Sequence, residues 1–135
     1  TSEEQIMFSN SDEDCLASVE SFLVDIYDVV VDYDPLGMDE YWIDDKVITI
    51  NDTKTLRQQL FVLLHEAGHV ILRSNPDFDE MFPGSKTSKI EILKEEVIAW
   101  EEGRKLAGKL QIPLGKEWEI HVRQAIMKYV HWVRV

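Results

Sequence analysis

The sequence predicts an α+β fold, in which a small antiparallel sheet packs on helices and a central helix carries an HExxH motif. Three observations predict it. Helical apolar patterns fill most of the chain, two β-type runs lie between residues 29 and 52, and no internal repeat or linker interrupts it. The length of 135 residues fits one domain. We place this domain at residues 12–135, behind a flexible and polar N-terminus at residues 1–11.

The first half of the chain contains one helix and the strands. From Asp12 onward, apolar residues recur at helical spacing, and acidic residues crowd the first turn, where the helix dipole favours them. The β-branched run VVVDYD, residues 29–34, has the composition of a strand. After a loop with Pro and Gly, the segment YWIDDKVITIND predicts two short antiparallel strands that reverse at Asp44–Asp45.

The second half of the chain predicts three helices. The central one runs from about residue 55 to 73, with N-cap candidates at Asn51 to Thr53. Two more helices are expected at residues 90–110 and 116–135. The loop at residues 75–89 carries Phe78, Met81 and Phe82. These residues suit either a lid or rim of a substrate site or a plain connection with hydrophobic anchors.

Charge and composition limit the classes of partner. The formal net charge is −12 and no basic stripe is present that would neutralise phosphates, so we do not expect a nucleic-acid partner. No apolar run reaches the roughly 20 residues needed to cross a bilayer, and no signal-peptide pattern is present. We therefore expect a cytoplasmic protein without membrane contact. The single cysteine, Cys15, cannot form an internal disulfide and is interpreted as a packing residue.

The central helix contains HEAGH, residues 65–69, inside a run of apolar residues. His65 and His69 lie one helical turn apart on one face, so both can bind one tetrahedral zinc at about 2.0–2.1 Å. Glu66 projects beside them, where it can hold a zinc-bound water and take its proton as the water attacks a carbonyl. Five-residue motifs of this type arise by chance, but buried histidines without a metal would be costly to satisfy. The sequence therefore predicts a zinc site.

A catalytic zinc needs a third protein ligand, and the later helix offers one. Glu96 lies on the apolar face of that helix, so we predict Glu96 as the ligand and Glu95 as the fallback. Glu95 is otherwise expected to be solvated, as are Glu101 and Glu102. His121 and His131 each stand alone on a core-type helix and are read as structural.

Two further features concern packing around this site. Gly68 weakens the central helix by about 1 kcal/mol relative to alanine, so it predicts close approach of another backbone. A donor for the oxyanion of a tetrahedral intermediate is not identified by the sequence. Tyr129, His121, Tyr41 and His131 are of suitable types, but each is better explained by packing.

These motifs together resemble the ImmA/IrrE family of zinc metallopeptidases, among the gluzincin-type zincins. The resemblance covers roughly residues 41–110 and rests on WIDDKVITIND, TLRQQLFVLLHEAGHVIL and EEVIAWEEGRKLA. The family pattern places a glutamate ahead of an Ala–Asn pair. Glu96 and Ala99 match it, whereas Trp100 replaces the asparagine. The chain is also similar to compact stand-alone members from bacteriophages and mobile elements.

The resemblance implies a zinc ion held by His65, His69 and Glu96, with Glu66 as general base. It also implies a protein or peptide substrate, such as a transcriptional regulator. Two alternatives stay open. One is a non-catalytic zinc-binding domain that regulates a partner, and the other is an acidic interaction protein that mimics DNA and carries a structural metal. Glu66 discriminates the peptidase from both alternatives, because a structural zinc has no use for a general base.

Overall fold

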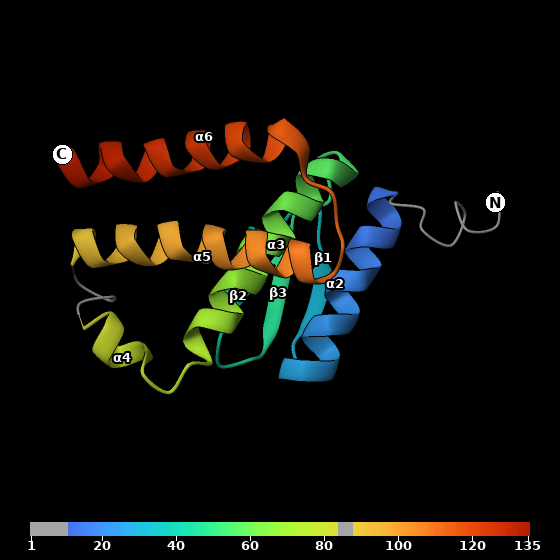
Figure 1. The fold of residues 1–135 in the computed structure, drawn as a ribbon, viewed down its shortest axis with the longest axis horizontal. Coiled ribbons are helices and arrows are strands. Elements are labelled where there is room, and N and C mark those ends of the chain that lie inside the picture. The colour runs from blue at the N-terminus through green and yellow to red at the C-terminus, as the bar shows by residue number, and fades with distance from the viewer. Residues whose placement is uncertain (1–10, 84–87) are drawn as a thin grey trace.

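The computed structural model describes residues 11–83 and 88–135 and confirms the α+β fold (Figure 1). Of the predicted flexible N-terminus, all but Ser11 lies outside the described residues. The elements are α2 (Asp12–Tyr27), β1 (Val30–Tyr33), β2 (Glu40–Trp42), β3 (Val47–Ile50), α3 (Leu56–Arg73), α4 (Phe78–Met81), α5 (Lys89–Lys109) and α6 (Gly115–Arg134). No helix in the described ranges is long and apolar enough to cross a membrane.

The sheet has the strand order β1-β3-β2, with β3 at its centre. The predicted strand pair forms, with Tyr41 of β2 opposite Ile48 of β3 in antiparallel register. The sheet as a whole is mixed, however, because β1 pairs with β3 in parallel, with Val31 opposite Ile48. The chain reverses once between β1 and β2 and again between β2 and β3. Two reversals leave β1 and β3 pointing the same way, so the expectation of a purely antiparallel sheet was wrong.

The hydrophobic core surrounds α3 and extends from the sheet and α2 to α5 and α6. Ile48 and Ile50 of the central strand are fully buried there. Leu16, Val19 and Leu23 of α2 belong to the same cluster, together with a row of apolar residues from α3. The predicted packing role of Cys15 is confirmed, since it is buried in this cluster.

Helices α3 and α5 pack backbone against backbone. A Cβ atom added at Gly68 of α3 would lie 1.9 Å from the carbonyl oxygen of Ala99 on α5. In the reverse direction, a Cβ at Gly103 of α5 would lie 2.5 Å from the carbonyl oxygen of Leu64 on α3. The prediction of close approach at Gly68 is thus confirmed, and α5 is the neighbour. Helix α6 then returns antiparallel alongside α5 (Figure 1).

The N-cap residue of α3 differs from the candidates that the sequence suggested. Thr55 is the N-cap residue and forms a capping box with Gln58. Asn51 instead closes the turn before the helix, where its side-chain oxygen accepts a hydrogen bond of 3.0 Å from the backbone N–H of Thr53. The candidates Asn51 to Thr53 were therefore four to two residues too early.

The connection between α3 and α5 contains a short helix, α4, that the sequence did not predict. Phe78 and Phe82 are buried in a small cluster with Leu72, and Ile98 of α5 packs against it. Met81 points outward and is 37% exposed. Phe78 and Phe82 therefore have the anchoring role that was one of the roles left open for this loop, because both side chains pack the connection onto α3 and α5.

Candidate metal centre

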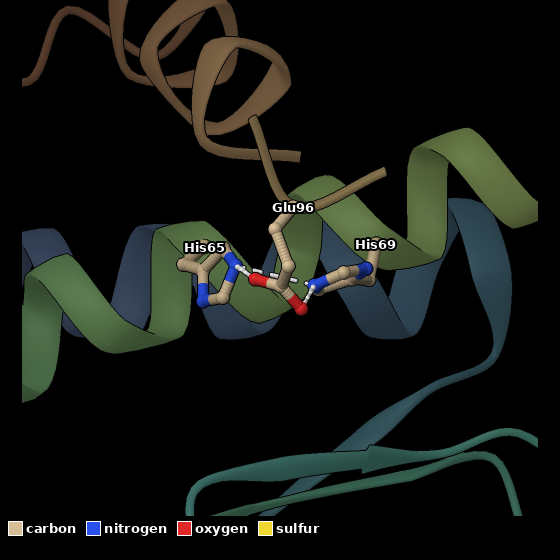
Figure 2. Close-up of side chains that lie close together, drawn as sticks. All are labelled: His65, His69 and Glu96. Atoms are coloured by element: carbon tan, nitrogen blue, oxygen red, sulfur yellow. Dashed lines mark hydrogen bonds and ion pairs between the residues drawn. The ribbon is translucent and has the colours of Figure 1, made fainter. Parts of the chain in front are cut away.

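His65, His69 and Glu96 converge at the crossing of α3 and α5 (Figure 2). The two histidines project from successive turns of α3, and Glu96 reaches between them from α5. Glu96 Oε2 lies 2.7 Å from His65 Nε2, and Glu96 Oε1 lies 3.2 Å from His69 Nε2. The two Nε2 atoms are 3.1 Å apart. The structure therefore brings together the three side chains that the sequence predicted as ligands.

The spacing of these atoms fits the zinc ion expected from the sequence. One ligand atom from each side chain lies within 4.8 Å of the other two. Tetrahedral zinc with bonds of about 2.0–2.1 Å holds its ligand atoms about 3.3 Å from one another. The distances of 2.7, 3.1 and 3.2 Å are all shorter than that edge length, and the two that involve Glu96 are made by different oxygens of its carboxylate. Small side-chain movements would open the group enough to hold an ion, and its use as a metal site stays a prediction.

Burial sets the electrostatics of this group. His69 and Glu96 are 9% and 8% exposed. Burial raises the pKa of Glu96, but hydrogen bonds from His65 and His69 outweigh it and hold the pKa far below its usual range. Burial likewise lowers the pKa of His69, but hydrogen bonds to Glu95 and Glu96 outweigh it and raise the pKa to about 10. Without a metal, the imidazole of His69 therefore stays protonated, and its positive charge balances the carboxylates of Glu95 and Glu96. A divalent cation bound here would take over that role.

Glu66 lies on α3 beside this three-residue group, and all four side chains line one cleft. It is only 6% exposed, and its Oε2 lies 3.8 Å from His65 Nδ1, too far for a hydrogen bond. Burial raises the pKa of this carboxyl to about 8, with the charge of His69 acting in the opposite direction. A carboxyl with a pKa near neutrality can both accept and release a proton at working pH.

Glu95 is buried, so its predicted solvation was wrong. It is 5% exposed, and its Oε2 lies 2.8 Å from His69 Nδ1, on the opposite side of the imidazole from the three-residue group. Arg73 donates to both carboxylate oxygens. The buried face of α5 therefore includes Glu95 in addition to the apolar stripe. Glu95 can be buried there because the guanidinium of Arg73 neutralises its carboxylate, which would otherwise stay in water. One signal in the sequence was available, since Arg73 follows His69 by one helical turn.

Trp100, which replaces the asparagine of the family pattern, forms one wall of the site. Its ring stacks on the imidazole of His65, with centroids 4.0 Å apart and planes inclined by 4°. Trp118 and His121 of α6 meet the same indole edge-on. Sequence reasoning noted the substitution at Trp100 but did not foresee this contact, which depends on the crossing of α3 and α5.

The side chains of His65, His69 and Glu96 open into this cleft, which has a volume of about 630 Å³ and lies between β2, α3, α5 and α6. Three of the four side chains considered as oxyanion donors line it, namely Tyr41, His121 and Tyr129; the lining does not include His131. Burial and the nearby Glu96 raise the pKa of Tyr129, so its phenol stays protonated. A second hollow of about 650 Å³ lies where α5 ends and α6 begins, and His65, His69 and Glu96 do not line it.

Comparison with known proteins matches this part of the chain to one family. A peptidase family described as the IrrE N-terminal-like domain matches residues 28–124, which extend from just before β1 into α6. The match includes Glu66 and the three residues that could hold a metal ion. No curated protein and no solved structure matches the chain.

Proposed function

The chain belongs to the IrrE N-terminal-like family of peptidases, and from that premise we propose that it is a zinc-dependent metalloendopeptidase. The observation that carries the proposal is the convergence of His65, His69 and Glu96 in a cleft that also contains Glu66. Two imidazoles and a carboxylate form the ligand set of several zinc peptidases, and they leave one coordination position open. The identity of the metal as zinc is part of this proposal.

In the proposed reaction His65, His69 and Glu96 would hold the ion through two Nε2 atoms and the carboxylate. A bound zinc ion would supply a Lewis acid that polarises the scissile carbonyl and lowers the pKa of water. The depressed pKa of Glu96 keeps its carboxylate ionised and ready to bind a cation. The three side chains are held on two helices that pack without intervening side chains at Gly68 and Gly103, which makes their spacing rigid.

Glu66 moves the proton in this scheme. Its carboxylate takes a proton from the attacking water, so that the oxygen forms a bond to the carbonyl carbon. The resulting carboxylic acid then returns the proton to the amine nitrogen as the peptide C–N bond breaks. In the metal-free protein burial keeps this carboxyl protonated near neutral pH, with a pKa of about 8. The positive charge of a bound cation would favour the ionised carboxylate that accepts the proton of the water.

The cleft provides donors for the substrate side of the reaction. Tyr129 and His121 both line it, and a neutral phenol is a suitable donor to the oxygen that gains charge. We propose a protein substrate, such as a transcriptional regulator, and a cytoplasmic location. These two points follow from the resemblance to the family and from the composition of the chain.

The experiment that tests this function separates metal binding from catalysis. Purified protein should contain one equivalent of zinc by elemental analysis, and His69→Ala should lose it. Glu66→Gln should keep the zinc but should no longer cleave a mixed peptide library, with the products detected by mass spectrometry. Glu101→Gln is the matched control, because Glu101 pairs with Arg104 on the surface and is not part of the cleft. Cleavage that survives in Glu66→Gln would overturn the mechanism, and wild-type protein that binds zinc but cleaves nothing would favour the regulatory alternative.

A further inference from the structure

The two ring nitrogens of His69 face two different carboxylates. Nε2 points to Glu96, at 3.2 Å, and Nδ1 points to Glu95 Oε2, at 2.8 Å. Glu95 does not belong to the three-residue group that could hold a metal ion. Its position at the far nitrogen is the one from which a carboxylate orients a metal-bound histidine without touching the metal.

We propose that Glu95 is a positioning residue, which holds His69 with its Nε2 lone pair directed at the metal, and that Arg73 clamps Glu95 for this purpose. The inference rests on the proposed metal site but not on peptide cleavage. A carboxylate that accepts the Nδ1–H proton fixes both the ring orientation and the tautomer. It also makes Nε2 a stronger ligand, because the imidazole gains electron density from the hydrogen bond.

Arg73 fixes Glu95 through two parallel hydrogen bonds. Its Nε donates to Oε2 at 3.1 Å, and its Nη2 donates to Oε1 at 2.8 Å. This bidentate geometry restricts the rotation of a carboxylate more than one hydrogen bond does. The guanidinium also lies over the ring of Phe78, 4.7 Å from its centroid, and Phe78 is anchored in the small cluster beneath α4. The connection between α3 and α5 thereby supports the clamp.

His65 lacks a comparable carboxylate among the described residues. Its Nδ1 lies 3.8 Å from Glu66 Oε2, beyond hydrogen-bonding distance, and its ring is held by the stack on Trp100 instead. The two histidines are therefore oriented by different means. Loss of Glu95 should release His69 and leave the His65 ring in place.

Zinc affinity of the full chain tests the inference. Metal-free protein is titrated with zinc in competition with a chelator of known affinity. Glu95→Gln keeps the shape of the side chain but replaces a charged acceptor by a neutral amide, and it should weaken zinc binding about 10–100-fold. Glu101→Gln, the surface control on the same helix, should bind zinc as the wild type does. Arg73→Lys, which keeps the charge but loses the bidentate pair, should give a smaller loss than Glu95→Gln.

A spectroscopic readout separates positioning from general stability. In zinc-loaded wild-type protein, the Nδ1–H proton of His69 should give a strongly deshielded NMR signal, because it is shared with a carboxylate. Glu95→Gln should move this signal upfield without moving the signal of His65. If Glu95→Gln does not fold, Arg73→Lys provides the same comparison in a milder form.

Two outcomes would overturn the inference, namely unchanged zinc affinity in Glu95→Gln or an unmoved His69 signal in the variants. Neither outcome depends on catalysis. The two proposals can also fail separately. If the wild type binds zinc but cleaves no peptide, and the variants show both the weaker zinc binding and the moved His69 signal, the proposed function is overturned and the positioning role is supported.

Discussion

The indole of Trp100 covers one face of the His65 imidazole, with the rings 4.0 Å apart and inclined by only 4°. Trp100 is itself buried, and within residues 11–83 and 88–135 its Nε1 has no hydrogen-bond partner. The indole therefore acts on His65 through its flat surface and not through its polar atom. This contact gives the chain a means to orient His65 at the position where the family pattern has an asparagine.

Replacement of Trp100 should show which property of the indole matters. We expect Trp100→Ala to lower the free energy of unfolding by about 3–5 kcal/mol, as for other buried aromatic residues, and to weaken zinc binding because His65 loses its support. Trp100→Phe keeps an aromatic face and removes the unpaired Nε1, so its losses should be clearly smaller. Urea unfolding of metal-free protein and zinc titration measure the two effects. An Ala variant that binds zinc as tightly as the wild type would refute the role of the stack.

The contact of α3 with α5 should depend on the absence of a side chain at position 68. A Cβ in Gly68→Ala would lie 1.9 Å from the carbonyl oxygen of Ala99, so the helices must separate. We expect a loss of about 3 kcal/mol or more in the free energy of unfolding, despite the gain of about 1 kcal/mol in helix propensity.

Gly108→Ala is the matched control for this prediction, because Gly108 lies on α5 and a Cβ there would meet nothing within 4 Å. It should stabilise the protein by up to about 1 kcal/mol through helix propensity alone. Chemical denaturation measures both variants. A neutral Gly68→Ala would mean that the two helices do not approach as closely as described.

Much of the site could be predicted from the sequence, because its determinants are local. The spacing of His65 and His69 is a property of any helix, and the apolar stripe through Glu96 identified the face of α5 that meets α3. Gly68 within an apolar helix indicated a backbone neighbour for the same reason. None of these inferences required knowledge of how distant elements are arranged.

The features that escaped prediction depend on tertiary contacts. Burial of Glu95 on α5 requires Arg73 on α3 as a partner. The apolar stripe of α5 gives no information on a partner from another helix. The stack of Trp100 on His65 likewise depends on the crossing of α3 with α5. The parallel pairing of β1 with β3 depends on where the chain returns, since β-type composition is the same in parallel and antiparallel strands.

Bound zinc should stabilise the folded protein by mass action. A ligand at 1,000 times its dissociation constant adds about 4 kcal/mol to the free energy of unfolding when it binds only the folded state. We expect zinc to raise the thermal midpoint of the wild type and of Glu66→Gln, and to have no such effect on His69→Ala. Thermal unfolding with and without a chelator provides the measurement. Equal stabilisation of His69→Ala would place the metal elsewhere in the chain.

The stability of the metal-free protein should fall as pH rises through neutrality. Burial raises the pKa of Glu66 from 4.5 to about 8, so the folded state binds this proton more tightly than the unfolded state. Its contribution is complete below pH 4.5 and is lost as pH rises through about 8. Hydrogen bonds to Glu95 and Glu96, against the effect of burial, raise the pKa of His69 from 6.5 to about 10. Its contribution is complete below pH 6.5 and is lost towards about 10.

Between pH 6.5 and 8 both groups act in the same direction. The free energy of unfolding should therefore decrease there, with each group contributing at most about 1.4 kcal/mol per pH unit. His65 does not oppose this, because burial lowers its pKa and confines its effect to the acid side of 6.5. Glu66→Gln removes one of the two groups, so its decrease over this range should be shallower. Urea unfolding at a series of pH values, with a chelator present, measures both slopes. If the free energy of unfolding of the metal-free wild type instead rises from pH 6.5 to 8, then Glu66 and His69 do not have the raised pKa values described.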